Sequence, residues 1–372
     1  MSYLGENIPK LGFGLMRLPM KDNEIDIEQT KAMVDMFLEN GFTYFDTAYV
    51  YYDGKSEAAT KVALVDRYPR EKFQLATKLP AWAGPKTVEE AREMFNTSLK
   101  RTGVGYFDYY LLHNLGSIRT KSFDDYGMWD YMRELKEKGL IRHAGFSFHD
   151  KADLLDEILT KHPEMEFVQL QINYGDWENG TVQSRKCYET ARKHGKPVII
   201  MEPVKGGMLA NPAPEVKAVF DETGSGASYS SWAIRFAASL EGIVTVLSGM
   251  SSLEQLKDNV SYMKSFAPLN EKERAVIEKA RATLASLPSV PCTGCEYCTA
   301  GCPKNISIPQ IFDIMNRELV YKDPNSAKFG YGFETRFGAR ASDCIQCGKC
   351  EEVCPQQINI TELLKEAVAK YE

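Results

Sequence analysis

Short apolar runs alternate with longer amphipathic stretches through roughly the first 250 residues, and this alternation constrains the fold more than any other feature. The apolar runs are rich in β-branched and aromatic residues, as buried parallel strands are. Helical signals separate them, such as the capping box Thr87-x-x-Glu90. The runs that read as strands cover residues 11–18, 42–48, 73–79, 106–113, 141–147, 167–173, 196–203 and 242–249.

Eight strand–helix repeats predict an α/β fold, a parallel (β/α)8 TIM barrel enclosed by helices. A doubly wound open sheet is the alternative, but no Gly-x-Gly-x-x-Gly follows an early strand to favour it. The chain has 372 residues, and a helical stretch at 252–287 runs into the linker SLPSVP. We therefore predict a barrel domain over residues 1–285 and a small, mostly helical domain over residues 286–372.

Ionisable residues end three consecutive predicted strands, at the edge where such barrels carry their active sites. Asp46, Lys78 and His113 hold these positions, and Tyr51 lies in the loop after Asp46. A carbonyl that accepts hydride needs a proton, which a tyrosine can donate when a nearby lysine stabilises its phenolate. An aspartate would hold the lysine, and a histidine would orient the carbonyl. A purely structural Lys–Asp pair, with the His and Tyr satisfied nearby, is the alternative.

The segments YFDTAYVYYDGKSE, LATKLP and FDYYLLHN resemble those of the aldo/keto reductase superfamily, and the similarity covers about residues 8–260. The resemblance implies a (β/α)8 barrel that interconverts carbonyl compounds and alcohols with NADPH or NADH. It also implies catalytic roles for Tyr51, Lys78, Asp46 and His113. The family's spacing favours this tyrosine over its neighbours Tyr49 and Tyr52.

The same resemblance implies contacts for the nicotinamide cofactor, and the sequence matches them only in part. Ser147 and Gln169 fit the carboxamide contacts, but Phe148 replaces an expected asparagine and Met201 an expected stacking tyrosine. The segment SGMSSLEQLKDN resembles the adenosine-phosphate segment through Ser251, Ser252, Gln255 and Asn259. A helix beginning there could bind phosphate, although Ser252 could equally act as a simple cap with Gln255.

The choice between NADPH and NADH stays open at this point. The basic residue expected to bind a 2′-phosphate is not obvious, and only Lys257 is near the adenosine-phosphate segment. The departures at Phe148 and Met201 leave room for a different redox cofactor. Trp82, Tyr49, Tyr52 and Trp177 lie on predicted loops, where they could line an apolar substrate site or simply pack.

Eight of the nine cysteines fall in two copies of Cys-x2-Cys-x2-Cys-x3-Cys-Pro, at 292–303 and 344–355. This is the spacing of bacterial [4Fe–4S] ferredoxins, in which the fourth cysteine ligates the other cluster. We therefore predict one cluster on Cys292, Cys295, Cys298 and Cys354, and a second on Cys344, Cys347, Cys350 and Cys302. Zinc on four thiolates is the rival interpretation. The ninth cysteine, Cys187, is expected to be a buried thiol.

The remaining composition excludes several classes of protein. A net charge of −6 without a long basic run does not suggest nucleic-acid binding. No apolar stretch is long enough to cross a bilayer, and the first residues lack a secretory signal. Cysteines in metal-type spacing favour a reducing, cytoplasmic compartment over disulfides.

Three functions follow from these patterns. The first is an NAD(P)H-linked oxidoreductase of aldehydes, ketones or sugar-type substrates that carries two [4Fe–4S] clusters for electron relay or structure. The second is an electron-transfer protein whose clusters exchange electrons with a flavin or an external redox partner docked on the barrel. The third is a non-catalytic redox sensor. Nicotinamide transfers two electrons as hydride and a cluster transfers one, so the role of the clusters in turnover is not fixed by the sequence.

Overall fold

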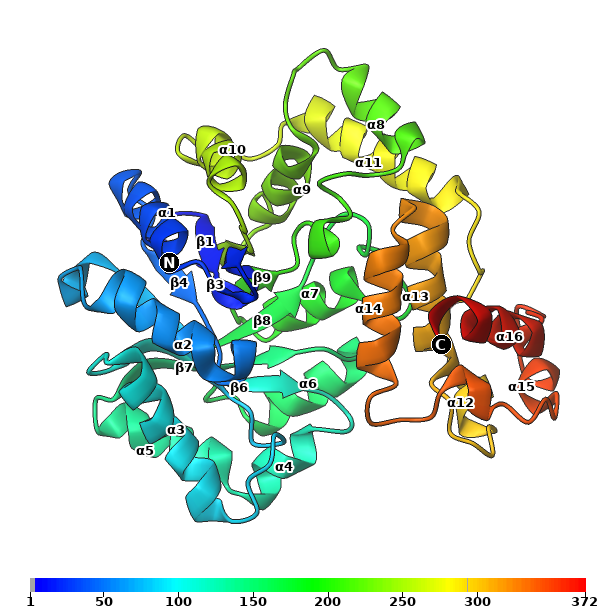
Figure 1. Ribbon diagram of the computed structural model, residues 1–372, viewed down its shortest axis with the longest axis horizontal. Coiled ribbons are helices and arrows are strands. Elements are labelled where there is room, and N and C mark those ends of the chain that lie inside the picture. The colour runs from blue at the N-terminus through cyan, green and yellow to red at the C-terminus, as the bar shows by residue number, and fades with distance from the viewer. Residues whose placement is uncertain (1–3, 293) are drawn as a thin grey trace.

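The computed structural model describes residues 4–292 and 294–372, and parallel strands close into a barrel in its larger part (Figure 1). The order around the barrel is β1-β10-β9-β8-β7-β6-β5-β4, so each strand pairs with its neighbours in sequence. The predicted barrel is confirmed, because every predicted run overlaps one strand. The strands are β1 (Leu11–Gly14), β4 (Tyr44–Asp46), β5 (Gln74–Leu79), β6 (Phe107–Leu115), β7 (Ile141–Phe148), β8 (Phe167–Gln171), β9 (Val198–Met201) and β10 (Ile243–Ser248).

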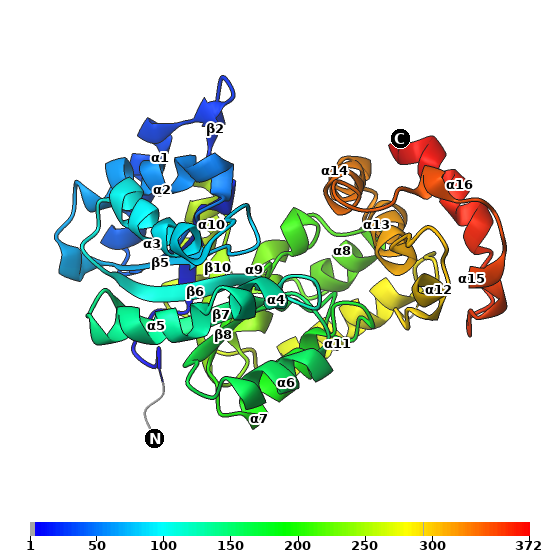
Figure 2. The same cartoon turned by 90° about the horizontal axis from the view of Figure 1, so that it is seen from below.

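Helices follow the strands and cover the outside of the barrel (Figures 1 and 2). Several begin at side-chain caps that the sequence encodes, including Asp26, Thr87, Ser252 and Asn270. The helices are α1 (Ile27–Glu39), α2 (Lys55–Thr60), α3 (Val88–Thr102), α4 (Thr120–Asp125), α5 (Met128–Glu137), α6 (Ala152–Lys161), α7 (Ser184–Lys193), α8 (Pro214–Asp221), α9 (Tyr229–Ala238), α10 (Leu253–Met263) and α11 (Glu271–Ser286).

The barrel interior is filled by side chains. Tyr44, Tyr109, Phe167 and Val244 pack there with other buried apolar residues, and Leu4 and Ile8 pack against this cluster. A much larger core lies between the strands and the outer helices. Because the interior is packed, the polar side chains at the carboxyl ends of the strands lie above a closed apolar core and not above a channel, as in other barrels of this type.

A two-stranded hairpin was not predicted from the sequence. It pairs β2 (Met20–Lys21) with β3 (Glu24–Ile25), and Figure 2 shows it projecting from the barrel at the top of the view. Asp22 and Asn23 form its turn and both have positive φ, at 53° and 64°. These are residue types that tolerate the left-handed region and form tight hairpin turns, so the Asp-Asn pair was the signal that could have revealed it.

A smaller helical lobe follows the barrel, with its own core (Figure 2). Its repeat, Cys-Pro-x-x-Ile-x-Ile, places Ile306 and Ile308 in one half and Ile358 and Ile360 in the other, and all four side chains are buried. The helices of this lobe are α12 (Tyr297–Ala300), α13 (Ile308–Tyr321), α14 (Pro324–Glu334), α15 (Lys349–Glu352) and α16 (Ile360–Tyr371).

The two cysteine loops of this lobe repeat the same backbone conformation. Each loop has left-handed residues two positions after its first cysteine, one position after its second and three positions after its fourth. The matched pairs are Gly294 and Gln346, Glu296 and Gly348, and Asn305 and Gln357. Non-glycine residues rarely adopt positive φ, so its recurrence at matched positions shows that the loops share one geometry.

The smaller lobe packs against the barrel through α13. Val320 and Tyr321 join the apolar cluster that contains Tyr174, and the ammonium of Lys205 lies 5.9 Å from the ring centre of Tyr321. Lys205 is itself buried and paired with buried Asp176. The first cysteine loop also contacts the barrel, because Glu296 forms an ion pair with Lys151 at 3.0 Å. These contacts fix the lobe on the β8 and β9 side of the barrel.

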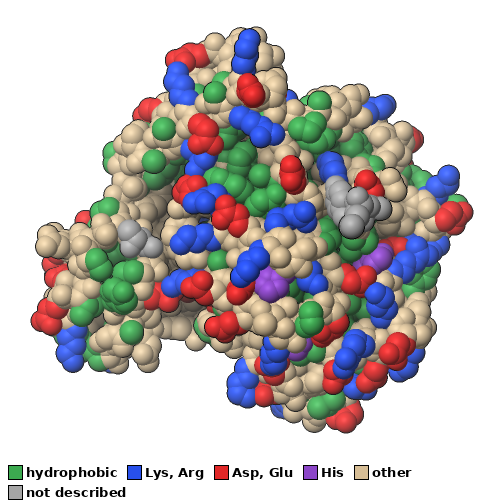
Figure 3. All heavy atoms as spheres, turned by 180° about the vertical axis from the view of Figure 1, so that it is seen from behind, with side chains coloured by type: hydrophobic (Ala, Val, Ile, Leu, Met, Phe, Trp, Pro, Cys, Tyr) green, Lys and Arg blue, Asp and Glu red, His purple; other side chains and the backbone are tan. Residues whose placement is uncertain are grey.

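The surface seen from behind mixes charges of both signs across both lobes (Figure 3). Within the described residues, every helix is too short or too polar to cross a membrane.

The loop after Tyr51 depends on one glycine, which gives a first prediction. Gly54 has φ +87°, and a Cβ there would come within 2.5 Å of the guanidinium carbon of Arg101. That guanidinium pairs with Glu57, which is fully buried. Gly54→Ala should therefore lower the free energy of unfolding by about 2–3 kcal/mol, from backbone strain and the displaced cation.

Gly41→Ala is the matched control. Gly41 has φ +84° with nothing within 4 Å of its virtual Cβ, so it carries the backbone strain alone, about 1 kcal/mol. Denaturant midpoints of the two variants give the comparison. Equal shifts would show that the close approach of Arg101 does not matter.

Candidate active site and cysteine pockets

Lys78 joins Asp46 and Tyr51 at the carboxyl end of the barrel. Its ammonium donates to a carboxylate oxygen of Asp46, to the carbonyl oxygen of Thr47 at 2.8 Å and to the phenol oxygen of Tyr51 at 3.3 Å. Lys78 and Asp46 are 1% and 2% exposed. The side chain of Gln169, from the opposite side of the barrel, donates to the second oxygen of Asp46 at 3.1 Å. The structure thus brings together three of the four residues predicted to be catalytic.

The charges in this cluster act on the tyrosine in opposite directions. Burial raises the pKa of Tyr51, Lys78 lowers it, and Asp46 raises it again, so the net direction is upward. Burial alone would lower the pKa of Lys78, but Asp46 and Tyr51 raise it above its ordinary value. The lysine is therefore held as a cation beside a protonated phenol. Its charge stabilises the phenolate that forms when the proton leaves.

His113, the fourth predicted residue, contacts the tyrosine through its ring. The ring centres of His113 and Tyr51 are 5.8 Å apart, with the rings nearly perpendicular. Burial, followed by the charges of Lys78, His149 and Arg119, lowers the pKa of His113 well below 6.5. Its buried Nδ1 has no hydrogen-bond partner among the described residues. A neutral imidazole can donate a hydrogen bond to a substrate from the ring nitrogen that carries its proton.

The residues expected to hold a nicotinamide carboxamide are present and already hydrogen-bonded. Ser147 is buried, and its hydroxyl accepts from the backbone N–H of Asn114 at 2.7 Å. Gln169 is bound to Asp46 as described. Phe148 is buried in the core, and Met201 ends β9. Ser147 keeps a hydroxyl proton to donate. Because its oxygen and the Gln169 amide are already bonded, and Phe148 and Met201 are apolar, this end of the site offers fewer free polar groups than the family pattern implies.

The predicted adenosine-phosphate residues form the start of α10. Ser252 caps the helix by accepting from the backbone N–H of Gln255 at 3.3 Å, and the Gln255 side chain accepts from the backbone N–H of Ser251 at 2.7 Å. Asn259 is buried and bonds to Ser248 and Tyr262. The capping interpretation of Ser252 and Gln255 therefore holds in this structure, and phosphate binding at the same helix end stays a proposal.

Two charged residues near this region were missed by the sequence analysis. The side chain of Arg17 runs over Gly249, and its guanidinium reaches toward Gly206, so it spans the loops after β10 and β9. Glu202 follows β9 with φ +55°, and burial raises its pKa although part of its side chain stays accessible to solvent. It lies at the carboxyl end of β9, and its charge raises the pKa of Tyr51. Neither residue carries a motif, and only the fold brings them to the site.

The four aromatic loop residues separate into one at the site and three in packing contacts. Trp82 donates its indole N–H to the carbonyl oxygen of His113 at 2.7 Å. Tyr49 packs under Arg101, and Trp177 packs against Tyr188 and Phe236. Tyr52 makes a long hydrogen bond of 3.5 Å to the carbonyl oxygen of Leu18. Tyr51 is the tyrosine that contacts Lys78, in agreement with the spacing argument.

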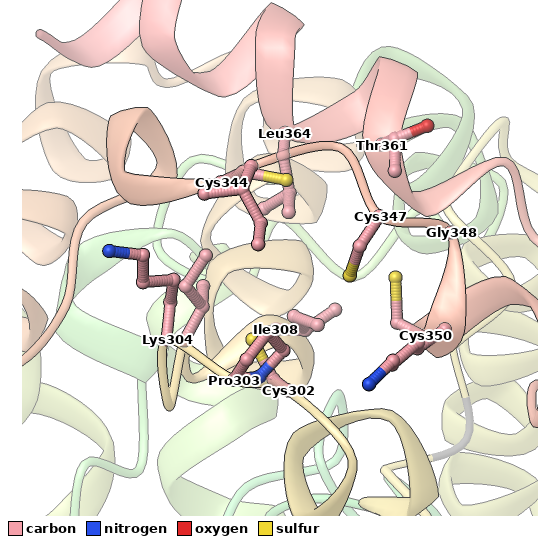
Figure 4. A pocket seen from close by; sticks show the side chains of 13 residues that line it. Cys302, Pro303, Lys304, Ile308, Cys344, Cys347, Gly348, Cys350, Thr361 and Leu364 are labelled. Carbon is pink, nitrogen blue, oxygen red and sulfur yellow. The ribbon is translucent and has the colours of Figure 1, made fainter.

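The eight cysteines of the two runs surround two pockets, and each pocket contains thiols from both runs. Figure 4 shows the sulfur atoms of the first pocket turned toward a common space, with Ile308 and Leu364 beside them. The cysteines around this pocket are Cys302, Cys344, Cys347 and Cys350. Those around the second pocket are Cys292, Cys295, Cys298 and Cys354. These are the groupings predicted from the ferredoxin spacing.

Apolar side chains line both pockets beside the thiols, among them Ile308 and Leu364 in the first and Phe312 and Ile358 in the second. Within residues 4–292 and 294–372, no three His, Cys, Asp or Glu side chains are arranged around one ion position. Four thiols around an apolar space fit a cluster. Cys187 stands apart, and burial raises its pKa to about 12.

Comparisons with known proteins agree with this geometry. The model of the aldo/keto reductase family matches residues 10–282, and that of a 4Fe-4S dicluster domain matches residues 291–359. An aldo-keto reductase from Mycolicibacterium smegmatis is 31% identical over 144 residues, which cover 38% of this chain and 47% of that protein. The chain spans about half the length of such curated relatives.

Solved structures share the barrel. Aldo-keto reductase AKR11C1 from Bacillus halodurans superposes with a TM-score of 0.61 at 26% identity, over 75% of this chain and 95% of that one. An aldo-keto reductase from Klebsiella pneumoniae, solved in complex with NADPH, gives a TM-score of 0.59 at 21% identity, over 75% and 95% of the two chains. The second likeness shows the fold alone.

The mixed origin of each pocket gives a second prediction. Cys292→Ala with Cys354→Ala removes two thiols from one pocket, so this double variant should keep the other cluster and about half the iron. Cys292→Ala with Cys302→Ala removes one thiol from each pocket and should retain less iron. Iron and acid-labile sulfide per chain, measured after anaerobic purification, give the order. The reverse order would mean that each run holds its own cluster, and zinc in place of iron would remove the cluster assignment.

Proposed function

The chain belongs to the aldo/keto reductase family of oxidoreductases and carries a 4Fe-4S dicluster domain, and on this basis we propose that it reduces aldehydes or ketones with NADPH or NADH. The observation that carries the proposal is the buried Lys78, bonded to Asp46 and Tyr51 beside the neutral ring of His113. We assign the reductase to residues 1–285 and the clusters to residues 286–372.

The proposed roles follow from the geometry. When bound, the nicotinamide supplies a hydride to the carbonyl carbon. Tyr51 donates its proton to the carbonyl oxygen, and Lys78 stabilises the phenolate left behind. Asp46 keeps Lys78 charged and in place. His113 orients the carbonyl through a hydrogen bond from its ring. The product is the alcohol, and Tyr51 regains its proton from solvent.

The residues that would hold the cofactor extend from the end of β7 to the start of α10. Ser147 and Gln169 would face the carboxamide, while Ser251, Ser252, Gln255 and Asn259 mark the adenosine-phosphate end. A phosphate would suit the start of α10, because a helix N-terminus favours negative charge. Arg17, which spans the loops after β9 and β10, adds a cation on the path between the two ends. An aldo-keto reductase of the same fold from Klebsiella pneumoniae binds NADPH.

The cysteine pockets fit two [4Fe–4S] clusters, one on Cys292, Cys295, Cys298 and Cys354 and one on Cys344, Cys347, Cys350 and Cys302. Such clusters supply one-electron transfer when bound. A second candidate function is therefore electron exchange between the dicluster domain and the barrel or an external partner. The ion pair between Glu296 and Lys151 favours it, because it sets the first cysteine loop on the barrel three residues after Phe148.

The two functions separate in one anaerobic experiment, in which NADPH or NADH is added without substrate. Bleaching of the visible absorbance of the clusters would support electron exchange with the barrel. Unchanged absorbance with continuing carbonyl reduction would leave the reductase working alone, with the clusters structural or reserved for another partner.

Loss of the Tyr51 hydroxyl gives a third prediction. Tyr51→Phe should lower kcat for carbonyl reduction by roughly 100-fold or more, since general acid catalysis contributes about 10²–10⁴-fold. Iron content should not change. Tyr52→Phe is the matched control, because its hydroxyl makes only a 3.5 Å contact with the carbonyl oxygen of Leu18. Steady-state kinetics on a panel of aldehydes tests this, and equal activity of the two variants would remove Tyr51 from the mechanism.

The pH dependence gives a fourth prediction. Tyr51 must be protonated to act, and its pKa is raised above the ordinary value of 10. Activity should therefore fall only when the pH rises through this raised pKa. His113 must be neutral, and its pKa lies well below 6.5, so no loss is expected as the pH falls to about 7. We expect kcat to be flat between about pH 7 and 9. A titration step inside this window would contradict the assigned protonation states.

A further inference from the structure

Arg119 lies next to the proposed catalytic groups and belongs to none of the roles given so far. It follows β6 on the loop that leads into α4, and its side chain is partly buried. Its guanidinium stacks on the ring of Trp82, with 5.0 Å from its central carbon to the ring centre. Trp82 in turn donates to the carbonyl oxygen of His113. Two contacts therefore link Arg119 to the catalytic histidine.

The position of Arg119 is fixed from a second side. One of its terminal nitrogens donates to the side-chain oxygen of Asn114 at 3.1 Å. Asn114 has φ +60°, and its backbone N–H is held by the hydroxyl of Ser147. A stacked, hydrogen-bonded guanidinium has lost much of its rotamer freedom before any ligand arrives, which lowers the entropy cost of binding one.

The charge of Arg119 has no partner close by. It forms no ion pair with any carboxylate in the described part of the chain, and the one acidic residue acting on it, Glu334 of α14, does so at longer range. Burial lowers the pKa of Arg119. Of its five N–H donors, the bond to Asn114 uses one. A partly desolvated cation with free donors favours an anionic ligand.

The neighbours of Arg119 are neutral. His149, directly after β7, has a pKa lowered to about 4 by burial and by the charges of Arg119 and Lys78, although part of its ring stays open to solvent. His113 is neutral as well. Lys78 is already paired with Asp46. One positive charge without an ion-pair partner therefore acts on His113, and a neutral His149 ring offers a further N–H.

We propose that Arg119 binds a carboxylate of the substrate, so that the preferred substrates are aldehydes and ketones that carry a carboxylate group. This specificity rests on the proposed reductase function of the same site. A planar guanidinium with free donors on one edge matches the two oxygens of a carboxylate. A phosphate monoester carries nearly two negative charges at neutral pH, so its binding would favour a second cation beside Arg119. Among the described residues, this part of the site lacks one.

The test compares oxo acids with their neutral methyl esters. The wild-type protein should reduce an oxo acid such as 4-formylbenzoate or succinic semialdehyde with a higher kcat/KM than the matching ester. Arg119→Met should lower kcat/KM for the acid by roughly 10- to 100-fold, mainly through KM, and leave the ester within about 3-fold. Arg119→Lys should recover part of the loss.

Lys121→Met is the matched control for net charge. Lys121 lies two residues further on, is exposed and pairs with Asp125, so the same change in charge there should leave the acid-to-ester ratio unchanged. Thermal melting of each variant checks folding. If Arg119→Met does not fold, the ratio measured for Arg119→Lys and Arg119→Gln replaces it.

The outcomes distinguish this inference from the function on which it rests. Equal use of acid and ester by the wild type, or an equal loss of both in Arg119→Met, would overturn the carboxylate site and leave the reductase standing. Preference for a phosphorylated aldehyde over every oxo acid would also overturn it. If no carbonyl is reduced at all, the proposed function fails, and calorimetry with benzoate decides the site alone: binding by the wild type that Arg119→Met loses would support it, and no difference would overturn it.

Discussion

The burial of the Lys78 ammonium is the constraint on which the barrel's chemistry depends. A charge so far from water is tolerated only when its partners are in place, since an unpaired one costs several kcal/mol. Those partners come from different parts of the chain: Asp46 from β4, Tyr51 from the next loop, and Gln169 from β8 to hold Asp46. They meet because the sheet closes on itself. The environment that sets the pKa of Tyr51 therefore depends on the closure of the barrel.

Much of this arrangement could be predicted from the sequence, for local reasons. Buried parallel strands appear as continuous apolar runs, so every strand of the barrel was visible. The carboxyl ends of such strands meet at one rim, so Asp46, Lys78 and His113 could be grouped before any contact was known. The cysteine pockets were predictable because this spacing is typical of two-cluster ferredoxins, in which the fourth cysteine of each run ligates the other cluster.

What the sequence did not reveal depends on where loops turn and where side chains point. Arg119 and His149 follow β6 and β7, and the pairing of these strands shifts register between Leu112 and Leu115, where Asn114 takes a left-handed conformation. No motif encodes that shift. The same limit applied to Asn259, which resembles a cofactor residue, yet its amide is already bonded to Ser248 and Tyr262. The sequence does not show the direction in which the Asn259 side chain points.

The exchange of thiols between the two cysteine runs has a consequence for the smaller lobe as a whole. Neither half of the repeat contains a complete set of four cysteines around one space, since Cys302 faces the pocket of the later run and Cys354 that of the earlier one. Each half therefore supplies three thiols to one pocket and the fourth thiol to the other. Half of the lobe, cut away from its counterpart, would have three thiols for its own pocket and a stray fourth. Both cysteine runs must therefore be folded together before either pocket has its four thiols.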